Sequence, residues 1–352
     1  MQTDNNLVSI IIPLFNQEPF TRLCLEFLLI NTPRNLFELI LVDNGSKDET
    51  SIYLQEIENT IPCKVIRNSE NLGFAKACNQ GASAAQGKSL LFLNNDTVVH
   101  LGWLEALLKV AQTQEKIGVL GSKLLHPDHK IQHAGVVFDV DGLPNHIYHR
   151  CENNLPAANK QRDFAAITGA CLMVSKEIFS KVGGFSEKYL NGFEDIDFCL
   201  KVREAGYRVV YCPESVVTHF ESRTYGRMRT QNQNLEIFQN AWRDKIKADL
   251  FIYLNLDGMA LVRFSGHVLF VTQKEIEPYI QAAIQEGQAL ANKNMMQDAA
   301  LIFGKKIKEF PFNNKLLQVF SKHCMVMGQS AAAESLQLQA KRFEQRILPE
   351  YT

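Results

Sequence analysis

The 352-residue sequence predicts an α/β domain followed by a small all-α region. Up to about residue 95, short apolar runs alternate with segments whose apolar side chains recur at helical spacing. The runs show no polar alternation, which is typical of strands in a parallel sheet that helices cover on both faces. Beyond about residue 275 the strand signals vanish and helical spacing continues. We therefore expect an α/β domain over residues 1–255, a β-rich connector over 256–275 and a helical extension over 276–352.

Composition places the chain among folded soluble proteins. Hydrophobic residues make up 46% of it and charged residues 21%, so it is not a disordered chain. Its length exceeds what one ordinary core spans, which favours two domains or one large domain with an appendage. Lys and Arg (37) nearly balance Asp and Glu (38). No generic basic surface is therefore predicted, and we expect no nucleic-acid partner.

Targeting and cysteine signals point to a cytoplasmic protein without a transmembrane segment. The N-terminus lacks the basic region and the long apolar run of a signal peptide. The most apolar late segment, residues 250–271, contains Asp257, Arg263 and His267, which argues against a membrane span. The eight cysteines have no CxxC spacing, which predicts reduced and mostly buried thiols instead of disulfides or a zinc site.

Four apolar strands are expected in the first part of the α/β domain, with one helix after each of the first three. The strands are expected at residues 8–12, 39–42, 64–66 and 90–93, and the helices at residues 18–30, from 48 onward, and at 74–85. Ser46 is expected to cap the second helix. Another helical pattern begins after Gly102.

The second part of the domain is expected to mix strands and helices. Strands are predicted at residues 131–140, 170–174, 207–211 and 216–220. An amphipathic helix over 196–205 ends at Gly206, which suits a residue just past a helix end. Asn234, Phe238 and Trp242 lie on one face of a later helix, which we interpret as the packing face of a helix that closes the domain.

Four loops follow the four predicted parallel strands, and every one carries Asn or Asp. These loops are residues 13–16, 43–46, 68–74 and 94–96. Turn formation alone favours such residues, but four of them at one edge of a sheet exceed what turns need. Ligands of open α/β sheets bind beyond the carboxyl ends of the strands. The sequence therefore predicts a binding site at this edge.

A second acidic cluster, GFEDID at residues 192–197, stands where a helix begins. Its carboxylates have two interpretations: they cap the helix, or Asp195 acts as a general base beside the crevice. His219 ends a strand soon afterwards and is either structural or a metal ligand. The residues alone leave both alternatives open.

An ordered set of motifs carries a family resemblance. The set is VSIIIPLFNQ, LILVDNGSKDET, NLGFAKACNQG, LLFLNNDTVV, ITGACLMVSKEIFSKVGGF, GFEDIDFCLKVREAGYRVVY and VVTHFES. Together these motifs, over residues 7–245, resemble the inverting family 2 glycosyltransferases, in the branch that includes bacterial rhamnosyltransferases. The resemblance implies the GT-A fold, a Rossmann-like nucleotide-binding mixed sheet with helices on both faces.

The activity implied by the resemblance is transfer of a sugar, with inversion, from a UDP- or dTDP-linked donor to an acceptor hydroxyl. A base must take the acceptor proton, and a divalent cation, Mg²⁺ or Mn²⁺, stabilises the departing diphosphate. The implied pathway is synthesis of bacterial polysaccharide, lipopolysaccharide or glycoprotein glycans. The acceptor is a glycan, a lipid-linked sugar or a protein, and peripheral docking at the inner face of the membrane stays open.

The resemblance also assigns residues to the donor site. Those that match nucleotide-binding positions are Pro13, Phe15, Asp43, Asn44, Asn71, Gly73, Asn94 and Asn95, and those that match the floor of the donor-sugar and acceptor site are Thr168, Gly169 and Ala170. Asp195 matches the catalytic base, with Glu194 beside it.

The metal ligands implied by the resemblance are Asp96 and His219. Asn94-Asn95-Asp96 occupies the slot of the family's DxD motif, but Asn94 stands where many relatives carry Asp. An amide can still accept a hydrogen bond and can also donate one. The lost negative charge should weaken cation binding. The motif therefore predicts a metal site in which Asp96 is the charged ligand.

Two other functions use similar sequence features. A nucleotidyltransferase uses a similar sheet, but its first loop is usually rich in glycine and basic residues, and residues 13–18 contain neither. A non-catalytic sugar-nucleotide binder is the second alternative, and the presence of Asp96, Asp195 and His219 argues against it.

The C-terminal helices carry a weak internal repeat. A shift of 33 residues takes Ala299 to Ala332, Ala300 to Ala333 and Phe303 to Leu336. This is one residue short of the tetratricopeptide period. Residues 276–352 therefore suggest either a tetratricopeptide-like pair of repeats, which would bind a partner protein or self-associate, or a plain helical appendage.

Overall fold

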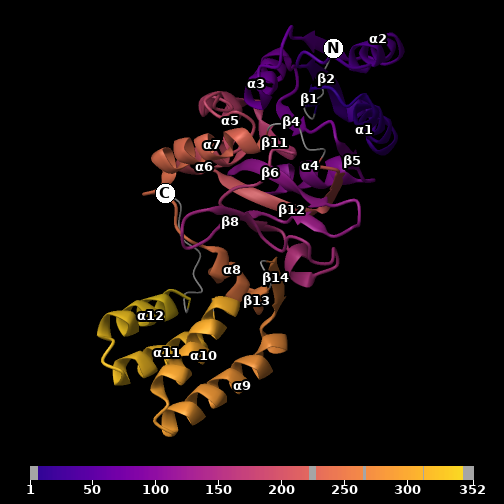
Figure 1. Cartoon of the computed structure of the whole chain (residues 1–352). Coiled ribbons are helices and arrows are strands. Elements are labelled where there is room, and N and C mark those ends of the chain that lie inside the picture. The colour runs from indigo at the N-terminus through magenta and orange to yellow at the C-terminus, as the bar shows by residue number, and fades with distance from the viewer. Residues whose placement is uncertain (1–6, 222–226, 265–266, 312, 344–352) are drawn as a thin grey trace. The chain divides into compact units, whose positions relative to one another are not determined.

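The computed structural model describes residues 7–221, 227–264, 267–311 and 313–343. The chain divides into two compact units (Figure 1). The first holds the described residues of Met1–Val137 and Pro144–Ile246, and the second those of Phe138–Leu143 and Lys247–Glu350. The predicted boundary at residue 255 thus lies within helix α8 (Leu250–Leu256), which belongs to the second unit.

One ten-stranded mixed sheet forms the centre of the first unit (Figure 1). Its strands are β1 (Val8–Leu14), β2 (Phe37–Asp43), β3 (Lys64–Arg67), β4 (Ser89–Leu93), β5 (Thr97–Val99), β6 (Ile117–Leu125), β7 (Ile131–His133), β10 (Arg162–Asp163), β11 (Cys171–Ser175) and β12 (Arg208–His219). The order is β10-β12-β6-β11-β4-β1-β2-β3, and β5 and β7 pair with β12 and β6. A separate two-stranded sheet joins β8 (Val136–Phe138) and β9 (Pro144–His146).

The predicted parallel core is confirmed. Strand β1 pairs in parallel with β2 and β4, and β2 pairs in parallel with β3. The register aligns Leu14 with Asp43 and Asp43 with Arg67, so the carboxyl ends of these strands meet at one edge. Strand β11 is antiparallel to both of its neighbours, β4 and β6, which makes the sheet mixed.

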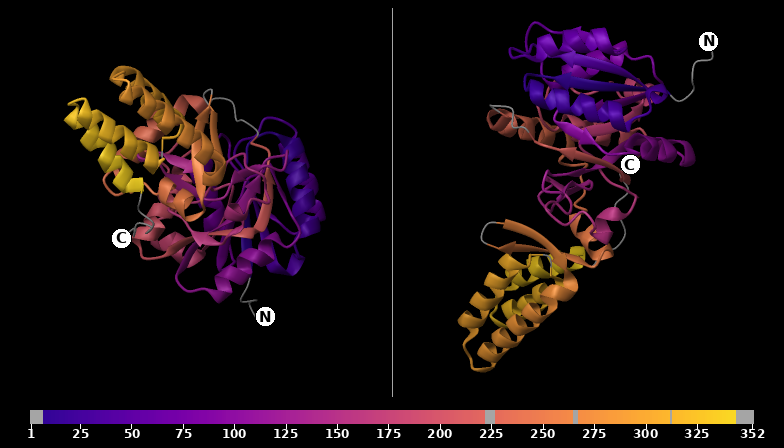
Figure 2. Two further views of the ribbon diagram at one scale, coloured as in Figure 1. Left: turned by 90° about the horizontal axis from the view of Figure 1, so that it is seen from below. Right: turned by 90° about the vertical axis from the view of Figure 1, so that its right-hand side faces the viewer.

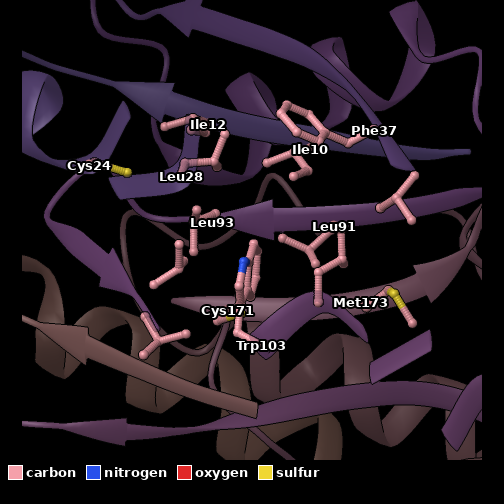
Figure 3. Packing of buried hydrophobic residues seen from close by; sticks show 14 of the residues in the cluster. Ile10, Ile12, Cys24, Leu28, Phe37, Leu91, Leu93, Trp103, Cys171 and Met173 are labelled. Carbon is pink, nitrogen blue, oxygen red and sulfur yellow. The ribbon is translucent and has the colours of Figure 1, made fainter. Parts of the chain in front are cut away.

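Helices cover both faces of this sheet because successive strand residues point to opposite sides. Helices α1 (Glu18–Asn31), α2 (Thr50–Thr60) and α4 (Trp103–Thr113) pack on one face with Ile10 and Ile12 (Figure 3). Ile11 belongs to the core on the other face, with α3 (Phe74–Ala84), α5 (Lys176–Lys181) and α6 (Glu194–Glu204). The remaining helices of the unit are α7 (Arg227–Trp242) and the short 3₁₀ helices η1 (Arg34–Leu36) and η2 (Pro156–Asn159).

Three sequence expectations need correction. The strand predicted at 131–140 is broken into β7 and β8 around Gly135, whose φ of +119° lies outside extended backbone. The two strands predicted over 207–220 are one strand, β12, with an irregularity between Cys212 and Val216. Ser46 does not cap α2, because that helix begins at Thr50 and the Ser46 hydroxyl instead accepts from the Asn16 N–H.

Side-chain burial confirms two other expectations. Asn234, Phe238 and Trp242 are all buried, so their shared helix face is a packing face. All eight cysteines are free thiols, and all but Cys63 and Cys151 are buried. Burial raises the pKa of the Cys24 thiol to about 12, which keeps it protonated and unreactive.

The second unit joins a β-hairpin to a group of helices. Besides α8 it contains β13 (Met259–Phe264), β14 (His267–Thr272), α9 (Gln273–Asn292), α10 (Met296–Glu309), α11 (Asn314–Val326) and α12 (Ser330–Phe343). Strands β13 and β14 pair antiparallel, within the stretch 256–275 that the sequence indicates to be β-rich. No helix among the described residues is both long and apolar enough to span a membrane.

Helices α9 to α12 pack in consecutive pairs (Figure 2). Helices α10 and α12 have 14 residues each and begin at Met296 and Ser330, an offset one residue longer than the shift seen in the sequence. In this register Ala299 matches Ala333, and both are fully buried, whereas Ala332 is exposed. The offset equals the tetratricopeptide period, and a repeat function for these helices stays a prediction.

Candidate functional site

The turn between β4 and β5 brings a carboxylate against an imidazole. Asp96 is only 6% exposed, and its Oδ1 lies 3.1 Å from His219 Nε2. Sheet pairing creates this contact, because His219, the last residue of β12, pairs with Thr97 at the start of β5. The main chain closes the corner, since the Phe220 N–H donates to the Asp96 carbonyl at 2.9 Å. Two residues far apart in sequence thus share one buried corner.

The two asparagines before Asp96 have different roles. Asn94 Nδ2 lies 3.3 Å from the same nitrogen of His219, so its side chain belongs to the corner. Its main-chain N–H donates to the Ala170 carbonyl at 3.0 Å. Asn95 Nδ2 donates instead to the hydroxyl of Thr21 in α1 at 3.0 Å. Asn95 therefore fixes the turn to helix α1, and Asn94 faces the site.

This corner fits a divalent cation. Asp96 offers a carboxylate oxygen and His219 an imidazole nitrogen at hydrogen-bonding separation, both mostly buried. No cluster of three or more potential ligands exists among the described residues. An ion held by two side chains keeps several positions for phosphate oxygens and water. A cation would thus be shared between the protein and a bound diphosphate.

Asp195 is held by main-chain donors in the first turn of α6. Its Oδ2 accepts from the Gly169 N–H at 2.7 Å and its Oδ1 from the Ile196 N–H at 2.9 Å. A Cβ on Gly169 would lie 3.2 Å from the Asp195 Cβ, so glycine allows this close approach. Ala170, the next residue, accepts the Asn94 N–H. The segment from Thr168 to Ala170 therefore connects the Asp195 carboxylate to the Asn94 corner.

The neighbouring carboxylates are buried and occupied. Glu194 Oε2 accepts from the Gly192 N–H at 2.6 Å, which ties the loop before α6 to its first turn. Asp197 Oδ1 accepts from Trp242 Nε1 at 2.8 Å, and Lys201 Nζ lies 2.6 Å from its Oδ2. These two residues are 6% and 4% exposed, whereas Asp195 is only half-buried. Of the three acids, Asp195 is the most exposed to solvent.

The residues after β2 form a second network. Asp43 is buried, and its two oxygens accept from the Ser46 N–H and the Ser51 hydroxyl at 2.9 and 3.1 Å. Asn44 Nδ2 donates to Asn71 Oδ1 at 2.9 Å, and Asn44 Oδ1 accepts from the Leu72 N–H at 3.0 Å. These side chains organise the loops at the ends of β2 and β3.

The first predicted loop joins the same network. The Asn44 N–H donates to the Leu14 carbonyl at 2.8 Å. Pro13 lies within β1, and Phe15, just beyond it, is half-buried. Gly73 caps α3 with a φ of +87°, a conformation that favours glycine. The predicted nucleoside residues therefore gather at the ends of adjacent strands, as the parallel register requires.

Replacing Gly45 with alanine is expected to unfold this network. Its φ is +81°, and an added Cβ would lie 2.6 Å from the main-chain carbon of Glu70. The main chains at Gly45 and Glu70 cannot move apart without disturbing both loops. We therefore expect Gly45→Ala to lower the free energy of unfolding by about 2 kcal/mol or more. Gly183→Ala is the matched control: φ is +87° but no atom lies within 4 Å, so about 1 kcal/mol is expected. Equal urea midpoints for the two variants would contradict the close approach.

Sequence reasoning missed one residue of the corner, Gln132, and the neighbour beyond it, His126. Gln132 in β7 contacts His219 through both ends of its amide, and His126 contacts Gln132 in turn. Neither stands in a motif, and Gln132 lies inside a segment whose only visible signal was strand propensity. Strand β7 is Ile131-Gln132-His133, and nothing in this sequence distinguishes Gln132 from an ordinary strand residue.

Two family models match the chain. Residues 9–183 match the model described as glycosyl transferase family 2, and residues 149–223 match one described as the N-terminal domain of galactosyltransferase. The first match runs from within β1 to just beyond α5. It includes the loops that carry Asp43, Asn71 and Asp96. The second covers Asp195 and His219.

Curated relatives share this part of the chain. An O-antigen biosynthesis protein of Myxococcus xanthus is 33% identical over 222 residues, which is 61% of this chain and 17% of that protein. An N-acetylglucosaminyl-diphospho-decaprenol L-rhamnosyltransferase of Mycobacterium tuberculosis is 26% identical over 212 residues, 54% of this chain and 68% of that protein. An uncharacterized protein of Sinorhizobium fredii is 35% identical over 237 residues. The chain spans a quarter or less of the first and third of these proteins.

Solved structures share the fold. The crystal structure of GalNAc-T7 with UDP, GalNAc and Mn²⁺ has a TM-score of 0.55 at 17% identity, covering 68% of this chain and 49% of that one. The mannosyltransferase PcManGT of Pyrobaculum calidifontis, in complex with GDP-Man and Mn²⁺, has a TM-score of 0.51 at 17% identity, covering 96% and 88%. The mixed sheet with helices on both faces is therefore the GT-A fold, as predicted.

Proposed function

The chain belongs to glycosyl transferase family 2 through residues 9–183, and on that premise we propose that it transfers a sugar from a UDP- or dTDP-linked donor to an acceptor hydroxyl with inversion. One observation carries the proposal. The Asp96 carboxylate meets His219 Nε2 in a buried corner, and residues 168–170 tie that corner to Asp195. A cation site and a base that one short segment connects are what a single displacement at a sugar diphosphate requires.

Asp195 is proposed as the base that takes the proton of the acceptor hydroxyl. Its oxygens accept from the Gly169 and Ile196 N–H groups, which fix the carboxylate plane. A carboxylate can take up a proton from a hydroxyl, which is the chemistry that a general base supplies. A base that deprotonates the acceptor on the face opposite the nucleotide allows one displacement, and one displacement inverts the anomeric centre. Glu194, predicted beside the base, is proposed to support this turn through its hydrogen bond from the Gly192 N–H.

Asp96 and His219 are proposed to hold the divalent cation, with Asn94 beside them. When bound, the ion would supply positive charge to the departing diphosphate. The chain's own contribution is to keep the two ligands together in a mostly buried corner. Fixed ligands lose little entropy when the ion and nucleotide arrive, which favours binding of both together.

The loops around Asp43, Asn44 and Gly73 are proposed to receive the nucleoside, with Pro13 and Phe15 beside the base. Support comes from their place at the carboxyl ends of β1, β2 and β3. Asp43 already accepts two internal hydrogen bonds, so it would bind a base or ribose through its remaining lone pairs. Thr168, which is half-buried, would border the donor sugar.

The acceptor is proposed to belong to a bacterial surface glycan or to a lipid-linked or protein precursor of one. Support comes from the relatives, of which one is an O-antigen biosynthesis protein and another a rhamnosyltransferase acting on a decaprenol-linked sugar. Their similarity covers little more than half of this chain. Residues 276–352 lie beyond the matched family models and would serve partner binding or self-association.

A donor screen tests the proposal. Purified protein is incubated with UDP-, dTDP- and GDP-sugars, with and without Mn²⁺, and both hydrolysis and transfer are measured. Turnover of one class of donor would support the proposal, whereas binding without any turnover would favour a non-catalytic binder. The anomeric configuration of the product, measured by NMR, tests inversion. Retention of configuration would rule out Asp195 as the base of a single displacement.

Mn²⁺ is expected to support faster transfer than Mg²⁺. His219 presents a nitrogen ligand to the ion, and Mg²⁺ prefers oxygen ligands whereas imidazole suits transition metals better. Excess chelator should abolish transfer, and Mn²⁺ should restore it at a lower concentration than Mg²⁺. Equal half-saturating concentrations of the two ions would show that His219 is not a ligand.

A further inference from the structure

Gln132 reaches the site from an irregular point in the sheet. Strand β7 pairs Leu124 with His133 and Leu125 with Ile131, so Gln132 is an extra residue without a partner in the ladder. Such bulges redirect a side chain out of the normal alternation. Gln132 is 3% exposed, and its amide lies against His219 at the end of β12. The bulge therefore places the buried amide of Gln132 against His219, in the corner that His219 forms with Asp96.

The amide of Gln132 holds His219 at two points. Its Nε2 donates to the main-chain carbonyl of His219 at 3.1 Å, and its Oε1 lies 2.7 Å from His219 Nδ1. The orientation of the amide follows from chemistry, because a carbonyl oxygen only accepts and so must face the NH₂ group. Oxygen Oε1 then faces Nδ1 and only accepts as well. His219 must therefore carry a proton on Nδ1.

The far side of the amide is also fixed. Gln132 Nε2 lies 3.3 Å from His126 Nδ1, and His126 Nε2 lies 3.0 Å from His149 Nε2. Burial lowers the pKa of His126, and the neighbouring His149 and Arg150 lower it further, so its ring is neutral near pH 7. A neutral ring that accepts at Nδ1 donates at Nε2. The hydrogen bonds therefore run in one direction, from His219 Nδ1 through Gln132 and His126 to His149.

Asp96 and Gln132 compete for the proton of His219. Asp96 Oδ1 lies 3.1 Å from Nε2 and would by itself attract the ring proton to that nitrogen. With its proton on Nε2, the ring would have no lone pair for a cation. With the proton held on Nδ1 by Gln132 and none on Nε2, the Nε2 lone pair points at the same corner as the Asp96 carboxylate. A cation satisfies both groups at once.

We propose that Gln132 is a positioning residue that keeps the Nε2 lone pair of His219 available to the divalent cation. The inference rests on the proposed function for the identity of the ion, and on geometry alone for the proton position. Hydrogen-bond partners of metal-bound histidines commonly change metal affinity or activity about 10- to 100-fold when replaced. A role of this size is expected for Gln132.

Two substitutions separate positioning from packing. Gln132→Leu removes the acceptor, whereas Gln132→Glu keeps an oxygen for the Nδ1 proton but buries a charge. We expect Mn²⁺ affinity, measured by electron paramagnetic resonance with saturating UDP, to fall about 10- to 100-fold in Gln132→Leu and to stay within about threefold of wild type in Gln132→Glu. In Gln132→Leu, kcat should largely recover at saturating Mn²⁺. His126→Ala is the control and should change Mn²⁺ affinity little, because the His219 carbonyl still orients the amide.

The outcomes distinguish this proposal from the proposed function. Equal losses in Gln132→Leu and Gln132→Glu, or no loss in either, would overturn positioning while wild type still binds Mn²⁺. If wild type binds no Mn²⁺, the metal assignment fails instead. The position of the ring proton of His219 is then measured without metal, by nitrogen NMR of protein that contains labelled histidine. We expect Nδ1 of His219 to be protonated in wild type and bare in Gln132→Leu, and a bare Nδ1 in wild type would refute the inference.

Discussion

Asp96→Ala is expected to abolish sugar transfer, with kcat/KM falling about 10³-fold or more. The substitution removes the carboxylate that faces His219 Nε2 in the buried corner. The diphosphate would then leave without the compensating charge of a bound cation. Initial rates with the preferred donor at saturating Mn²⁺, together with Mn²⁺ binding in the presence of UDP, measure the effect. Full activity of Asp96→Ala in excess chelator would contradict the metal assignment.

Asn94→Asp is the matched control in the same turn. Asn94 Nδ2 lies 3.3 Å from His219 Nε2, so a carboxylate at this position adds negative charge to the corner. We expect activity to be retained and Mn²⁺ binding to tighten. Loss of activity in both variants would indicate that the turn had been disrupted and that the ion was not the cause.

Asp195→Asn is expected to lower kcat about 10²- to 10⁴-fold, the usual contribution of a general base. The amide oxygen can still accept from the Gly169 N–H, although the NH₂ group cannot accept from the Ile196 N–H as the second carboxylate oxygen does. The amide cannot take a proton from the acceptor. Because Asp195 accepts hydrogen bonds from the Gly169 and Ile196 N–H groups, beside the proposed acceptor site, we expect KM for the donor to change little. Steady-state kinetics with varied donor and acceptor separate the two parameters.

Asp197→Asn tests whether the effect belongs to Asp195 alone. Asp197 lies on the same helix but contacts Trp242 and Lys201. Losing the charge opposite Lys201 should lower the free energy of unfolding by roughly 1 kcal/mol and leave kcat nearly unchanged. If Asp197→Asn lost as much activity as Asp195→Asn, disturbance of helix α6 would explain both, and Asp195 would not be the base.

The sequence predicted the parts of the molecule that depend on local spacing. Strands β1 to β4 are continuous apolar runs, and the loops after them differ from ordinary turns by their repeated Asn and Asp. Parallel pairing then places those loops at one edge without further information. The resemblance supplied the roles proposed for Asp96, Asp195 and His219, which spacing alone left open.

The features that the sequence did not predict depend on contacts between distant residues. Gln132 and His219 are 87 positions apart, and the bulge that joins them arises from the pairing of β7 with β6. Strand β12 also continues through an irregularity that resembles a turn in sequence. The division into units falls before α8 because that helix packs its apolar residues with the C-terminal helices, and periodicity does not say which core a helix joins.

The most direct test of the central claim is the anomalous diffraction of Mn²⁺ in crystals of the protein with UDP. We predict one strong peak within coordination distance of Asp96 and of His219 Nε2, with UDP phosphate oxygens completing the shell. A peak bound to other side chains, or to UDP alone with Asp96 and His219 still in contact with each other, would contradict the site described for this chain.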